Sequence, residues 1–519
     1  MSGAKAVSDV RDRAAETSFA ERDEIRAAET LSGERGEERS AARSSDEGRG
    51  SQSAENLSAL RGTSRVAAKS AEVRGAWRVG WLLAGALLGA CASNQSWRHA
   101  APELPAAAPP VVAPRVERIG PALLHVRRAS PTLAIGLAFR TSHAIGPALA
   151  GFTLELVARG PDRAVEDALG EHGGAIEAVW LGDGALLLAE VDAAGWEQAL
   201  ATIVAAVRNP DFTPEDVEVL RRERLAAIQR RDGDPAGEGL HTMLRRLAPR
   251  LDGLGTARAT SQWSIEQVRT SHEQLLREGG PTLVIVGDPP RAGLERAAAA
   301  FAPWGVAARA PAARAPAQPP GEVLVVPRPG LAQTAIVVGR AVHGADDLAL
   351  ELASAVVGSA LRDVLRRDRG DTYGVSVAHT PARGGGLLAI ETQVDAAATG
   401  ASLRAMVSQL KTLQGRFLTG DVLRLLGRAF QVERMLGHQR LADVAVAVAR
   451  AHISSRPDDA LAAELRRLGA VRDDDVERAL ATWFEPTALQ IVLVGDPATI
   501  RAQVEPLGLG PLKIVDDGS

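Results

Sequence analysis

Residues 283–289 read Leu-Val-Ile-Val-Gly-Asp-Pro, and residues 491–497 read Ile-Val-Leu-Val-Gly-Asp-Pro. Each stretch is a short apolar run, rich in β-branched residues, that ends in a Gly-Asp-Pro turn, which is typical of a buried strand. A second pair repeats in the same order, with Phe-Thr-Pro-Glu-Asp-Val at 212–217 and Phe-Leu-Thr-Gly-Asp-Val at 417–422. The two offsets are 208 and 205 residues, so the chain contains an internal repeat.

The segments around these stretches alternate between strand and helix patterns. Strands are predicted at 122–127, 132–140 and 185–191, and helices at 147–158 and 163–172. Thr213, followed by Pro and two acids, predicts one long helix start, and Ser264 with Gln267 has the form of a capping box for another. The sequence therefore predicts an α+β fold of two homologous α/β sandwich domains in tandem. Two unrelated domains with similar last strands are the alternative.

Composition and charge bound the classes of protein. The 519 residues are 45% hydrophobic and 24% charged, a composition typical of globular proteins. The formal net charge of −4 gives no reason to expect a nucleic-acid partner. The single cysteine excludes a disulfide framework and a Cys-based zinc site. We place the two domains at 115–308 and 321–510, with a Pro/Ala-rich linker at 309–320.

The first 114 residues differ from the rest in composition. Residues 1–73 are polar and predict a disordered leader, or a start assigned too far upstream. Residues 74–91 have the form of a signal segment, with two arginines, a short apolar run and Leu-Gly-Ala-Cys at 88–91. That ending looks like a bacterial lipobox, which would make Cys91 the lipidated residue, and residues 92–114 a Pro/Ala-rich tether. A buried free cysteine is the alternative for Cys91.

The predicted domains resemble the insulinase/pitrilysin-type zinc metallopeptidases, which include the mitochondrial processing peptidase. In that family the first domain carries the helix motif Gly-Leu-Ala-His-x-x-Glu-His-x-x-x-x-Gly. Residues 148–160 keep the framework of this motif, with Ala-Leu-Ala at its start and Gly160 at its end. The chemistry is absent, since Gly151 stands at the first His, Leu154 at the catalytic Glu and Glu155 at the second His.

The histidine spacing leads to the same conclusion. A helical zinc site needs two imidazoles one turn apart, and none of the ten histidines has another three or four positions away. Glu218 and Glu223, on the helix where the family has its third ligand, are expected to lie on a solvated face without partners. No metal and no other cofactor is expected in this chain.

A second family motif is retained. The family has Leu-Arg-x-x-x-Gly-x-x-Tyr where a helix ends before a strand, and residues 365–373 match it with Arg366 and Tyr373 in place. The resemblance implies that both side chains reach the substrate and the reaction centre. A phenol can donate to an oxyanion, and a guanidinium can hold carbonyls or a carboxylate. The alternative is a surface arginine and a half-buried tyrosine; Tyr373 is the only tyrosine.

The resemblance implies a function in a pair of subunits. We expect a non-catalytic subunit of a bacterial zinc peptidase heterodimer, inactive alone, whose partner holds the zinc and an intact His-x-x-Glu-His motif. The substrate would be an extended peptide, added as a strand to a sheet edge such as residues 185–191. The alternative is an inactive peptide-binding or scaffold lipoprotein. We expect a cell-envelope protein, lipid-anchored to the outer membrane and facing the periplasm.

Overall fold

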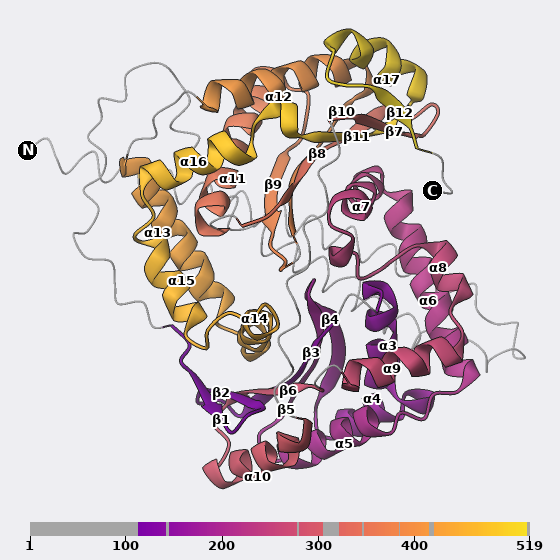
Figure 1. Cartoon of the computed structure of the whole chain (residues 1–519), viewed down its shortest axis with the longest axis vertical. Helices are drawn as coiled ribbons and strands as arrows, with labels where there is room; N and C mark the ends of the chain where they lie inside the picture. The colour runs from indigo at the N-terminus through magenta and orange to yellow at the C-terminus, as the bar shows by residue number, and fades with distance from the viewer. Residues whose placement is uncertain are drawn as a thin grey trace, which may run out of the picture. The chain divides into compact units, whose positions relative to one another are not determined.

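The protein folds around two six-stranded mixed sheets, one in each half of the sequence (Figure 1). The structure is a computed structural model, and it describes residues 113–141, 145–277, 280–304, 321–344, 347–383, 385–414 and 420–515. Cys91, the leader, the tether and the 309–320 linker lie outside the described residues. Within the described ranges, no helix is both long and apolar enough to cross a bilayer.

The first half is built from strands β1 to β6 and helices α3 to α10. Its elements are β1 (Val116–Ile119), β2 (Leu123–Arg127), β3 (Thr132–Arg140), α3 (Pro147–Arg159), α4 (Ala164–Gly170), β4 (Ala175–Trp180), β5 (Gly184–Asp192), α5 (Trp196–Arg208), α6 (Pro214–Gly233), α7 (Pro235–Leu247), α8 (Ala257–Gln262), α9 (Ile265–Arg277), β6 (Thr282–Gly287) and α10 (Arg291–Phe301), with short 3-10 turns at Pro161–Arg163, Pro249–Leu251 and Ala302–Trp304.

The second half is built from strands β7 to β12 and helices α11 to α17. Its elements are β7 (Val323–Pro327), β8 (Gln333–Val342), α11 (Asp347–Arg362), a π-helical turn η4 (Asp363–Asp368), β9 (Val375–Thr380), β10 (Gly386–Asp395), α12 (Thr399–Gln414), α13 (Gly420–Gly437), α14 (Leu441–Ile453), α15 (Ala460–Leu468), α16 (Asp473–Trp483), β11 (Gln490–Gly495), α17 (Pro497–Val504) and β12 (Leu512–Ile514), with 3-10 turns at Ala396–Ala398, Pro486–Ala488 and Glu505–Leu507.

The two sheets repeat one strand order. It is β1-β2-β6-β3-β5-β4 in the first and β12-β7-β11-β8-β10-β9 in the second. The two orders correspond strand by strand except at one end, where β1 is the first strand of its half and β12 is the last strand of its half. The repeated strands β6 and β11 lie inside their sheets and are buried along their whole length. The predicted α+β class with two similar sheets is therefore confirmed.

Local signals start the long helices where the sequence predicts them. Thr213 caps α6 in a complete capping box, because its hydroxyl accepts from the Asp216 N–H at 3.1 Å and Asp216 accepts from the Thr213 N–H. Ser264 and Gln267 form the predicted reciprocal bonds before α9. These caps orient α6, which carries part of the candidate site.

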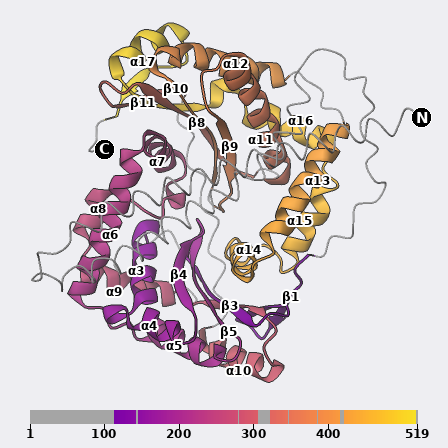
Figure 2. The same cartoon turned by 180° about the vertical axis from the view of Figure 1, so that it is seen from behind.

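Each sheet is covered on one face by its own helices and on the other by a helix of the opposite half. α14 packs on β3, β5 and β6 in one apolar cluster, and α7 packs on β8, β10 and β11 in another (Figures 1 and 2). Gly239 permits the close approach of α7, since a Cβ there would lie 3.0 Å from a Val337 methyl. The two described halves thus share their cores.

One strand expected from the sequence at an open edge of a sheet lies inside the sheet instead. The strand predicted as an edge, residues 185–191, is β5, and it lies between β3 and β4 with both of its sides paired. That expectation is wrong because β4, which was not predicted, covers β5. Among the described strands, β4 is the last in the first sheet and β9 the last in the second.

Candidate functional site

The residues at the degenerate zinc-motif positions lie on α3, in the interior of the first half. Gly151 and Leu154 are buried, Leu154 to 1% exposure, while the Glu155 side chain is about one-third exposed. Gly151 offers no side chain and Leu154 no polar atom, so two of the three positions cannot take part in metal binding or proton transfer. The residues present do not fit the zinc ion that the family resemblance implies.

A buried arginine lies against these positions instead. Arg224, on α6, is 4% exposed, and its Nη2 bonds Glu155 Oε1 at 2.9 Å. The same nitrogen lies 3.9 Å from where a Cβ on Gly151 would be, and the guanidinium stacks over Phe152 at 5.6 Å. A fixed positive charge therefore lies beside the degenerate motif, and it would repel a divalent cation there.

The Arg224 guanidinium is held from its other side by a loop. Its Nη1 donates to the Gly253 carbonyl at 2.9 Å and more weakly to the Leu254 carbonyl at 3.4 Å. Gly253 has no room for a side chain, since an added Cβ would meet the Trp180 ring at 2.5 Å. The loop thus supplies backbone acceptors in place of further acidic side chains.

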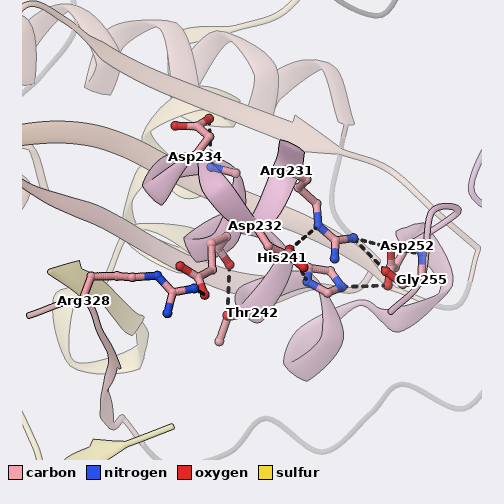
Figure 3. A network of polar contacts seen from close by, with 10 residues as sticks. Arg231, Asp232, Asp234, His241, Thr242, Asp252, Gly255 and Arg328 are labelled. Atoms are coloured by element: carbon pink, nitrogen blue, oxygen red, sulfur yellow. Dashed lines mark hydrogen bonds and ion pairs between the residues drawn. The ribbon is translucent and has the colours of Figure 1, made fainter. Parts of the chain in front are cut away.

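A polar network fixes this loop to α6 and α7 (Figure 3). Asp252 accepts from His241 Nε2 at 3.1 Å and from the Gly255 N–H at 2.9 Å, and Arg231 donates to the Gly255 carbonyl at 2.8 Å. Burial opposes ionisation of Asp252, but these donors, led by His241, lower its pKa overall. The network includes His241 and the aspartates Asp232, Asp234 and Asp252, yet no group of His, Cys, Asp and Glu suited to a metal occurs in the described ranges.

The two glutamates expected on a solvated face both have partners. Glu223 Oε2 bonds Arg159 Nη2 at 2.6 Å across to α3, and Glu218 pairs with Arg221 at 2.9 Å along α6. Glu218 is exposed, as expected of a solvated face, while Glu223 is about one-third exposed and faces α3, and arginines pair with both. Burial opposes the charged form of Arg159, but the hydrogen bond that it donates to the Glu223 carboxylate raises its pKa overall.

The retained arginine lies in the second half, in the π-helical turn that continues α11. Arg366 is exposed, and no hydrogen bond or ion pair joins it to another described residue. Its neighbours differ, since Arg367 pairs with Asp363 at 2.7 Å and Arg369 with Asp371 at 2.6 Å. Single π turns are frequent at functional sites. Arg366 is therefore the cation of this turn that is available to a ligand.

The retained tyrosine stands on a fixed backbone and points into solvent. Tyr373 is 89% exposed, whereas Thr372 before it is buried and bonds Thr392 at 2.9 Å and the Gly374 carbonyl at 3.0 Å. The preceding turn is closed by the Asp371 N–H bonding the Leu365 carbonyl at 2.8 Å, with Gly370 at φ +71°. The phenol has no partner among the described residues. The backbone is ordered on both sides of a side chain that contacts nothing.

Gly151, Leu154 and Glu155 lie together on α3 in the first half of the described chain, whereas Arg366 and Tyr373 belong to the second half, Arg366 in η4 and Tyr373 two residues before β9. Arg224 was missed by sequence reasoning. The sequence feature that could have identified it is the spacing of the buried residues of α6, which are Val217, Leu220, Arg224 and Ile228. An arginine at a core position of a helix needs an acid or carbonyl groups around it.

The fold is that of known peptidase-like proteins. It matches the crystal structure of a Peptidase M16 inactive domain from Pseudomonas fluorescens, with TM-score 0.66 and 20% identity over 74% of this chain and 98% of that one. A protease from Helicobacter pylori matches with TM-score 0.66 and 14% identity, over 74% and 100%. The periplasmic protease PqqL of Escherichia coli matches with TM-score 0.56 and 13% identity, over 74% and 46%.

Residues 262–421 match the family model described as the Peptidase M16 inactive domain, while no curated protein matches the chain. The predicted resemblance to insulinase-type peptidases is thereby confirmed. The chain is thus similar in fold to M16-type peptidase domains, and residues 262–421 are similar to the inactive domain of that family. It differs from the family motif by the ion pair between the buried Arg224 and the partly exposed Glu155, and its Arg366 and Tyr373 are exposed.

Proposed function

We propose that this chain is the non-catalytic subunit of a bacterial zinc peptidase heterodimer. The observation that carries the proposal is Tyr373, a lone, fully presented phenol on an anchored backbone. A tyrosine side chain offers an apolar ring and a hydroxyl group together, which suits it to contact another molecule. Loss of the zinc residues beside retention of Arg366 and Tyr373 supports a division of labour between two chains.

Arg366 and Tyr373 would act on the substrate in the partner's site. The zinc ion and an intact His-x-x-Glu-His motif would belong to that partner, and none is expected here. The Tyr373 hydroxyl would donate a hydrogen bond to the oxyanion that forms at the scissile carbonyl. The Arg366 guanidinium would hold peptide carbonyls or a carboxylate by paired N–H donors.

The peptide would bind in extended form against an open strand edge. β4 and β9 each end their sheet on one side, opposite β1 and β12, so the backbone groups on their outer sides are not used by another described strand. β9 begins two residues after Tyr373, which favours β9 as the strand that aligns the peptide with the phenol. Main-chain hydrogen bonds then supply affinity that depends little on sequence.

The proposal includes a place in the cell envelope. Lipidation at Cys91 would anchor the chain to the outer membrane, facing the periplasm, with acyl chains each contributing about 0.8 kcal/mol per buried methylene. The E. coli protein that shares the fold is described as periplasmic, which supports this placement. Labelling with a radioactive fatty acid, lost in Cys91→Ala, tests it.

Substitution of Tyr373 tests the catalytic part. In the assembled heterodimer, Tyr373→Phe should slow peptide hydrolysis about tenfold or more, since removal of one oxyanion donor costs at least that much, and should leave subunit association unchanged. Ser376→Ala, at an exposed position of β9, is the matched control. Unaltered hydrolysis by Tyr373→Phe would refute the assigned role.

Capture of the partner comes first. The full chain, immobilised and exposed to lysate of its own source, should retain a protein with the intact zinc motif, identified by mass spectrometry. Recovery of envelope proteins without a peptidase would instead make the chain a peptide-binding or scaffold lipoprotein, and the roles given to Arg366 and Tyr373 would be withdrawn.

A further inference from the structure

A cavity of about 250 Å³ lies where the ends of the two open strands meet, and it takes no part in the functions assigned above. Its wall is formed by the end of β4, by β9 and β10, and by α7 and α14, and its large apolar residues include Trp180, Leu240, Leu244 and Leu387. An apolar cavity of about 150 Å³ already admits a benzene ring. One branched or aromatic side chain therefore fits.

The rim of the cavity is fixed by contacts between the turns that follow β4 and β9. The Arg383 N–H donates to Asp183 Oδ2 at 2.6 Å, and the Trp180 indole donates to the Arg250 carbonyl at 3.1 Å. Asp183 is 4% exposed. The cavity is thus bounded by satisfied polar contacts and is already formed without a ligand.

One cation opens into this cavity without a partner. Arg450, in the last turn of α14, lines the cavity, and no hydrogen bond or ion pair joins its side chain to a described residue. Burial by the surrounding protein lowers its pKa, and Arg434 nearby adds to this while Glu464 opposes it. The lining also includes the carboxylate of Glu391, which has an interaction partner of its own. The cavity therefore combines apolar walls with a guanidinium that makes no hydrogen bond or ion pair to a described residue.

We propose that this cavity binds the free carboxyl terminus of an extended peptide that ends in an apolar residue. The last side chain lies among Leu240, Leu244 and Leu387, and the terminal carboxylate binds the Arg450 guanidinium. A peptide end is favoured over another anion because β4 and β9 end at the cavity with unpaired outer edges, which can bind the preceding residues as a strand. The choice of a peptide rests on the proposed function, while the pocket for an apolar carboxylate stands independently.

Binding to the isolated full chain tests this inference without any partner subunit. The probe is a fluorescein-labelled hexapeptide, Gly-Ser-Ala-Thr-Ala-Leu, prepared as the free acid and as the carboxyl-terminal amide, with fluorescence anisotropy as readout. The acid should bind about tenfold more tightly than the amide, because a charge-assisted hydrogen bond is roughly twice as strong as a neutral one. If the peptide acid does not bind, the test of Tyr373 in the assembled heterodimer is unaffected. If Tyr373→Phe leaves hydrolysis unaltered, the binding test is unaffected.

Variants locate the binding to the cavity. Arg450→Gln should abolish the preference for the acid, Arg450→Lys should keep part of it, and Leu244→Phe should weaken both probes by filling the cavity. Arg466→Gln is the control, since Arg466 pairs only with the exposed Asp459. Equal binding of acid and amide, or a preference that survives Arg450→Gln, overturns the inference. Binding of dodecanoate but not of the peptide overturns it in favour of a free fatty acid.

Discussion

Removal of the Arg224 guanidinium should destabilise the first half strongly. Arg224→Ala deletes a charge-assisted bond to the partly buried Gly253 carbonyl, worth about 1.5–3 kcal/mol. It also deletes the 2.9 Å pair with Glu155, which we discount to about 1 kcal/mol because that side chain is 36% exposed. Stacking on Phe152 adds about 1 kcal/mol. The expected loss is about 4 kcal/mol, within the range for deleting one partner of a buried pair.

Urea unfolding followed by tryptophan fluorescence measures this loss. Trp263 reports on the site, since its ring centroid lies 5.2 Å from that of Phe152. Arg224→Lys should lose clearly less than Arg224→Ala, because it keeps a charge but cannot bond Glu155 and Gly253 together with one planar fork. A loss below about 1 kcal/mol for Arg224→Ala, or equal losses for the two variants, would refute the view that this cation stabilises the degenerate motif.

Two further predictions concern stability. Burial, with a nearby Arg140, lowers the pKa of His452 to about 4. In the unfolded chain this pKa is higher, so the unfolded chain takes up a proton first as the pH falls. The free energy of unfolding is therefore retained above about pH 6.5 and falls by about 2 kcal/mol between pH 7 and pH 5. His452→Gln should flatten that loss in urea titrations, and an unchanged slope would contradict it. Gly239→Val should cost about 1–3 kcal/mol by pressing on Val337, whereas Gly233→Ala, in open space at the end of α6, should not destabilise.

Local patterns predicted much of the fold because they depend on neighbours in the sequence. The strand and turn at 283–289 and its repeat at 491–497 have β-branched cores and turn residues that need no distant information, and the caps at Thr213 and Ser264 are satisfied within three residues. The class of fold followed from their recurrence at one offset.

The errors arise where one segment meets another from far along the chain. Residues 185–191 are apolar except for Glu190, which is equally typical of an edge strand packed against helices and of the inner strand that β5 is. β4 reads Ala-Ile-Glu-Ala-Val-Trp, which does not alternate strictly between apolar and polar residues, so the sequence pattern does not mark it as a strand. The partners of Glu223 and Arg224 lie on α3 and in the loop after α7, so no spacing within α6 predicts them.

The exchange of α7 and α14 between the two sheets has a consequence for synthesis of the protein. When β6 has left the ribosome, one face of the first sheet has no cover, because residues 441–453 have not yet been made. The nascent first half therefore cannot bury this apolar face until nearly the whole chain is translated. Truncation anywhere before α14 would leave a product that is prone to aggregate, rather than a smaller folded domain.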